Sequence, residues 1–73
     1  MRVIDTELVD KIVNEFAYKA NKMNDFDLYV QIENRIMEAS LHLWSMDPEW
    51  STEMKGTIFD RIRLEQKQWE LFD

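Results

Sequence analysis

The sequence contains no cysteine, one glycine, one proline and one histidine among its 73 residues. Without cysteine the chain forms no disulfides, and His42 alone cannot supply the Cys and His ligands from which structural zinc sites are chiefly built. A single glycine excludes a glycine-rich phosphate-binding loop. Because so short a chain buries little surface, we expect its stability to come from well-packed helices or from association with another chain.

Long apolar runs are also missing. The longest uncharged stretch, residues 39–46, is far shorter than the ~20 residues that a membrane span needs. The first ten residues include both acidic and basic side chains with no apolar run behind them, so we expect no secretory signal peptide. These absences predict a soluble, cytoplasmic protein that does not contact a membrane.

Basic residues are too few for ordinary binding to a phosphate backbone. Nine Lys and Arg against 15 Asp and Glu give a formal net charge of −6, whereas nucleic-acid binding relies on clustered cations. We therefore expect no direct contact with nucleic acid. Hydrophobic residues make up 45% of the chain, which is too many for a disordered acidic segment.

Apolar residues recur at intervals of three and four, and this period predicts an all-α fold. We expect a single helical domain over residues 1–73, a small three-helix bundle running up, down and up. Asp5 or Thr6, Asp25 and Pro48 are suitable helix starts. The last helix either continues through Gly56 or breaks there in a left-handed cap. The expected helices cover about 6–22, 25–45 and 48–72.

The first two helices differ in how much apolar surface they carry. One half of the first helix is apolar, from Leu8 through Ile12 to Phe16, so this helix should bury one face. The second helix has two apolar stripes, one through Ile32 and one through Val30. A helix that is apolar over more than half its circumference should bury two sides, and we expect it to lie between the other two helices.

The segment "LWSMDPEWST" places two tryptophans on either side of the proline. Asp47 suits a helix N-cap and Pro48 the first helical position, so the segment predicts an elbow between two helices. Trp44 and Trp50 would then pack across the elbow and fix its angle. The alternative is that they are anchors for a binding partner.

Leu64 and Leu71 do not fit the core pattern of the last helix. Met54, Ile58 and Ile62 line one side, whereas these two leucines lie seven residues apart on the other side. Stacked apolar residues at heptad spacing suggest a second partner for this helix. The predicted protein-binding residues are Trp44, Trp50, Leu64, Trp69, Leu71 and Phe72.

The acidic composition suggests which kind of protein would be bound. Carboxylates steer a protein toward a basic patch on its partner, and the predicted acidic surface is Asp47, Glu49, Glu53 and Asp60. A small acidic helical protein could act as a regulator or inhibitor by docking on another protein. Surplus apolar surface also predicts a homodimer, and a structural homo-oligomer is an alternative function.

No residue pattern predicts catalysis or a resident cofactor. His42 is the only conventional base, and its neighbour Glu38 lies with it on the polar side of the second helix. The alternative is a Mg²⁺-dependent enzyme assembled in an oligomer from acidic side chains, with Glu33 as the most interesting member. Because no motif with a mechanism is present, we predict binding without catalysis and no metal site.

Overall fold

The computed structural model describes residues 5–16 and 19–72, and for residues 69–72 it describes the backbone alone. The described part is almost entirely helical and contains no strand, so the all-α prediction is confirmed. The elements in chain order are α1 (Thr6–Glu15), the 3₁₀ helix η1 (Lys19–Lys22), α2 (Asp25–Ala39), α3 (Leu41–Met46) and α4 (Pro48–Phe72).

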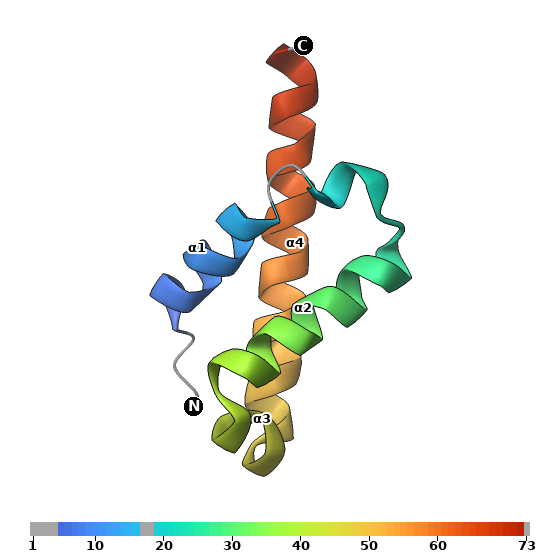
Figure 1. Ribbon diagram of the computed structural model, residues 1–73. Coiled ribbons are helices and arrows are strands. Elements are labelled where there is room, and N and C mark those ends of the chain that lie inside the picture. Colours follow the sequence, from blue (N-terminus) through green and yellow to red (C-terminus); the bar gives the residue numbers. More distant parts are fainter. Residues whose placement is uncertain (1–4, 17–18, 73) are drawn as a thin grey trace.

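The long helix α4 is the element against which the others pack (Figure 1). α1 and α2 cross the same side of α4, η1 connects them, and α3 lies near the beginning of α4 (Figure 1). The prediction that the second helix lies between the other two is therefore wrong. The helix with neighbours along most of its length is the last one, because only α4 is long enough to contact every other element.

One hydrophobic core lies between α4 and the elements that cross it. The predicted apolar side of the first helix is confirmed, and so is the inward side of the last helix. α2 contributes one stripe only, since its second stripe faces outward. The buried apolar side chains are Val9, Ile12, Val13, Phe16, Ala20, Leu28, Ile32, Ile36, Trp50, Met54, Ile58 and Ile62.

Polar side chains cap the starts of three helices as the sequence indicates. Asp5 accepts a hydrogen bond from the N–H of Leu8 at 3.1 Å, and Asn24 accepts one from the N–H of Asp27 at 2.8 Å. At the elbow, the N–H of Trp50 donates to Asp47 Oδ1 at 3.1 Å. Each cap satisfies a first-turn N–H that has no partner within its own helix.

The division into three helices is not confirmed, because two of the expected helices are interrupted. The first α-helix ends at Glu15, and the chain continues in a separate 3₁₀ turn at Lys19–Lys22; residues 17–18 lie outside the described part. The second ends at Ala39, because Ser40 adopts φ −154° and ψ 77°, outside the helical region. Serine readily leaves a helix because its hydroxyl competes for backbone hydrogen bonds.

α4 passes through Gly56 without a break, and Gly56 is not required there by its backbone conformation. A methyl group at this position would meet no atom of the described residues within 4 Å. We therefore expect Gly56→Ala to raise the free energy of unfolding by roughly 0.5–1 kcal/mol, because alanine has the higher helix propensity. Urea unfolding followed by circular dichroism measures this change. A variant less stable than wild type would contradict the finding that the space around position 56 is open.

Candidate protein-binding surface

α3 exposes more large apolar side chains than its length would suggest. It has six residues, and none of them is buried. Leu41 is 61% exposed, Met46 is 71% exposed and Leu43 is 39% exposed. We call these three residues the α3 tip, because α3 lies at one end of the molecule (Figure 1). Clustered apolar exposure of this kind marks contact sites in soluble proteins.

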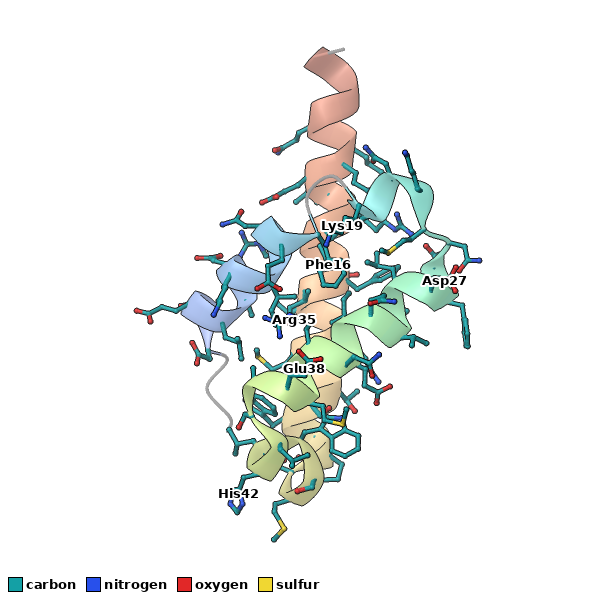
Figure 2. The ribbon with its side chains drawn as sticks, in the orientation of Figure 1. Phe16, Lys19, Asp27, Arg35, Glu38 and His42 are labelled. Carbon is teal, nitrogen blue, oxygen red and sulfur yellow. The ribbon has the colours of Figure 1, made fainter. Side chains whose placement is uncertain are left out.

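The chain around the α3 tip is acidic. Between Arg35 and Lys55 it contains four carboxylates and neither lysine nor arginine. His42, the only other group here that can become cationic, is exposed on α3 at the end of the molecule (Figure 2). The four carboxylates are Glu38, Asp47, Glu49 and Glu53. The chain that carries the α3 tip is thus rich in carboxylates, one of which, Glu38, pairs with Arg35.

The two tryptophans of the elbow take different positions. Trp50 is 6% exposed and belongs to the core, whereas Trp44 is partly buried and packs against that core. Both tryptophans therefore contribute to the core. Trp50 has too little exposed surface to contact a partner.

The predicted acidic residues do not form one continuous row. Asp47 is half-buried and caps α4, whereas Glu49, Glu53 and Asp60 are exposed along α4. Around the start of that helix lies a shallow hollow of about 340 Å³, whose described lining is Pro48, Glu49, Thr52 and Glu53.

The remaining predicted protein-binding residues lie toward the other end of α4. Leu64 is 59% exposed, as its mismatch with the core pattern predicted. The side chains of Trp69, Leu71 and Phe72 lie outside the described residues.

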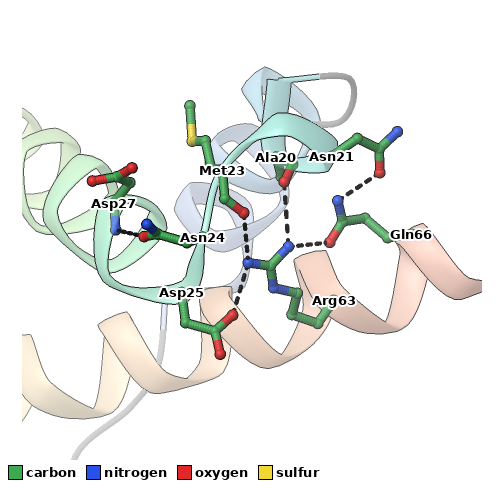
Figure 3. A network of polar contacts seen from close by, with 8 residues as sticks. All are labelled: Ala20, Asn21, Met23, Asn24, Asp25, Asp27, Arg63 and Gln66. Atoms are coloured by element: carbon green, nitrogen blue, oxygen red, sulfur yellow. Dashed lines mark hydrogen bonds and ion pairs between the residues drawn. The ribbon is translucent and has the colours of Figure 1, made fainter.

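Arg63 holds the connection between α1 and α2 onto α4 (Figure 3). Its guanidinium donates to the carbonyl oxygens of Ala20 at 3.2 Å and Met23 at 3.1 Å, and to Asp25 Oδ1 at 2.8 Å. It also donates to Gln66 Oε1 at 2.7 Å. Gln66, which is buried, continues the network by donating to Asn21 Oδ1 at 2.6 Å (Figure 3). These contacts fix where α2 begins.

A second arginine links α1 to α2. Arg35 donates to both carboxylate oxygens of Glu15, at 2.7 and 2.8 Å, and to Glu38 at 2.9 Å. Its position between the two helices is visible in Figure 2. The hydrogen bonds from Arg35 lower the pKa of Glu15, and the bonds to Glu15 raise the pKa of Arg35. The pair is partly exposed, so its contribution to stability is small.

Glu33, the residue named for a possible metal site, and two other carboxylates of α2 pair with basic side chains. Glu33 is partly buried and lies 3.5 Å from Lys55 Nζ. Glu38 pairs with Arg35, and Asp25 pairs with Arg63. Within the described ranges, no three His, Cys, Asp or Glu side chains come close enough together to hold a metal ion.

α2 has a further apolar surface that the sequence pattern placed in the core. Val30, which belongs to the predicted second buried stripe, is 39% exposed, and Phe26, which the pattern assigned to neither stripe, is 75% exposed. Beside them, Tyr29 stacks on Phe59 of α4 with ring centroids 4.2 Å apart, and Arg63 lies 5.4 Å from the centroid of the Phe59 ring. The second stripe was a correct signal of surplus apolar surface but not of burial.

Comparison with known proteins adds no relative. Over the described part of the chain, no helix combines the length and apolar character that crossing a membrane requires. No protein-family model, curated protein or solved structure matches this chain.

Proposed function

We propose that this chain is a small protein-binding module that regulates or inhibits another protein by docking on it, without catalysis. The observation that carries the proposal is the α3 tip. Leu41 and Met46 are mostly exposed on a helix with no buried residue. A small domain with little core of its own would gain from covering them, because burying apolar surface favours association.

The charge around the tip indicates the class of partner. The four carboxylates between Arg35 and Lys55 would repel an acidic surface and favour one bordered by lysine and arginine. Apolar side chains at the centre and charges at the rim are the usual arrangement of a protein interface. We infer that the partner offers an apolar groove with a basic border, into which Leu41 and Met46 insert.

A double variant tests this function directly. Leu41→Ser with Met46→Ser should leave the fold intact, because both side chains are mostly exposed. The wild-type chain and the variant, each immobilised, are compared for the proteins they retain from the native host. We expect at least one protein that wild type retains roughly tenfold better than the variant, with binding that weakens as salt is raised.

Phe26→Ser is the matched control, because it makes the same kind of change at a large apolar side chain that is 75% exposed on α2, away from the α3 tip and from the predicted protein-binding residues. It should keep the partner that the double variant loses. If every retained protein binds the double variant as well as wild type, the α3 tip is not the docking surface. A structural homo-oligomer remains the alternative function, and its subunits would associate through a surface other than the α3 tip.

A further inference from the structure

The side of α4 that faces away from the core is a second surface with residues that the isolated fold does not explain. Glu53, Gly56, Asp60, Leu64 and Lys67 lie within about 80° of one another around this helix, from its spacing of 100° per residue. We call these five residues the outer stripe. The four with side chains are all exposed, because α1, α2 and η1 pack on the opposite side.

Two members of the outer stripe are unexplained by the isolated fold. Leu64 is 59% exposed in the middle of an otherwise polar stretch. Gly56 costs helix stability, yet no described atom lies within 4 Å of where its Cβ would be. Both features are explained if another helix packs here. That helix would bury the side chain of Leu64, and the missing side chain at Gly56 would let its backbone approach closely.

The charges of the outer stripe indicate which chain packs on this side of α4 and whether it runs parallel or antiparallel. Asp60 and Lys67 have no ion-pair partner among the described residues, and they lie on either side of Leu64 along the helix. If a second copy of the chain packs antiparallel, Asp60 of each copy meets Lys67 of the other and Leu64 packs on Leu64. A parallel arrangement would instead set Asp60 against Asp60.

We propose that the outer stripe of α4 binds a second copy of this chain in antiparallel orientation, in the register that pairs Asp60 with Lys67. Gly56 lies four residues before Asp60, and Leu71 lies four residues after Lys67. The same register therefore brings position 71 of one copy opposite Gly56 of the other. This pairing uses a different surface from the α3 tip and does not depend on the proposed function.

Analytical ultracentrifugation of the full chain at about 10 to 500 µM tests the association. High concentrations are needed because an interface made by a single pair of helices is small. We expect the mass to rise from the 8.9 kDa monomer toward twice that value. Leu64→Glu should weaken the dimer roughly a hundredfold, since a symmetric interface contains each substitution twice. A monomer throughout this range would overturn the proposal.

Exchanging the two charges tests the register. Asp60→Lys alone and Lys67→Asp alone should each weaken the dimer roughly tenfold, because like charges then meet at both ends. The variant with both changes should dimerise as wild type does. An equal mixture of the two single variants should form a mixed dimer, which mass spectrometry under native conditions detects.

Lys11→Asp is the matched control for net charge. It changes the charge as Lys67→Asp does, but Lys11 is exposed on α1 and lies outside the outer stripe. It should leave dimerisation within about twofold of wild type. If Lys11→Asp weakens the dimer as much as Lys67→Asp, or if the double exchange fails to restore it, the register is wrong.

Gly56→Leu distinguishes an effect on the dimer from an effect on the stability of the monomer. A Cβ at this position meets no described atom within 4 Å beyond its own helix backbone and chain neighbours, and leucine has a higher helix propensity than glycine, so the melting temperature of the dilute protein should not fall. The dimer should weaken at least tenfold, because the side chain fills the space left for the second helix. Unchanged dimerisation would exclude close packing at Gly56.

Discussion

Trp50→Ala is expected to lower the melting temperature by more than about 10 °C, or to leave no cooperative transition at all. Trp50 is 6% exposed and is the largest side chain of the core. Replacing a buried aromatic residue by alanine costs about 3–5 kcal/mol. A domain of this size has a total stability of only about 4–11 kcal/mol, and each kcal/mol shifts its melting temperature by roughly 4–8 °C.

Thermal unfolding followed by far-ultraviolet circular dichroism measures the effect of Trp50→Ala. Trp44→Ala is the natural comparison, because Trp44 is only partly buried and should cost less. If Trp50→Ala melted as wild type does and lost binding to a partner instead, Trp50 would be an interface anchor and its place in the core would be wrong.

Arg63→Met should cost about 2–3 kcal/mol, the second largest effect we expect. Methionine keeps much of the aliphatic volume but removes every hydrogen bond that the guanidinium makes. The carbonyl oxygens of Ala20 and Met23 would lose a charged donor, as would the carboxylate of Asp25. Hydrogen bonds to a charged group contribute more than neutral ones, and losing them at a partly buried site is costly.

Arg61→Met is the matched control for Arg63→Met. Arg61 also lies on α4 and pairs with Asp10 of α1 and with Glu65. Asp10 is exposed, and Glu65 and Arg61 itself are partly exposed, so the loss should stay below about 1 kcal/mol. Urea unfolding of both variants measures the difference. Equal losses for the two arginines would contradict the special role of Arg63 in fixing the start of α2.

Local patterns in the sequence predicted those parts of the fold that depend on neighbours along the chain. Apolar spacing identified the buried sides of α1 and α4, including Ile12 and Ile58. Side chains that accept hydrogen bonds from the backbone a few residues later identified the starts of α1, α2 and α4. These features follow from helix geometry and need no knowledge of the tertiary fold.

Features that depend on residues far apart were missed. Arg63 bonds to the carbonyl of Ala20 across 43 positions, and nothing near either residue indicates it. The second apolar stripe of α2 was expected to be buried because α2 was placed at the centre. Once α4 takes that place, no helix of the described part covers Val30, which is 39% exposed. The exposed α3 tip was missed for a local reason: the helix breaks at Ser40, and serine alone is a weak signal for a break.

The absence of buried residues in α3 has a consequence for its motion. Ser40 and Asp47, the residues at its two ends, are both outside the helical region, with φ −154° and φ −136°. Opening these six residues would expose little apolar surface, so the amide protons of α3 should exchange with solvent through local fluctuations that leave the rest folded. Exchange in the middle of α2 and α4 should instead require unfolding of the whole molecule. Among the described helices, the one without a buried side chain is thus also one that can change shape at a low cost in free energy.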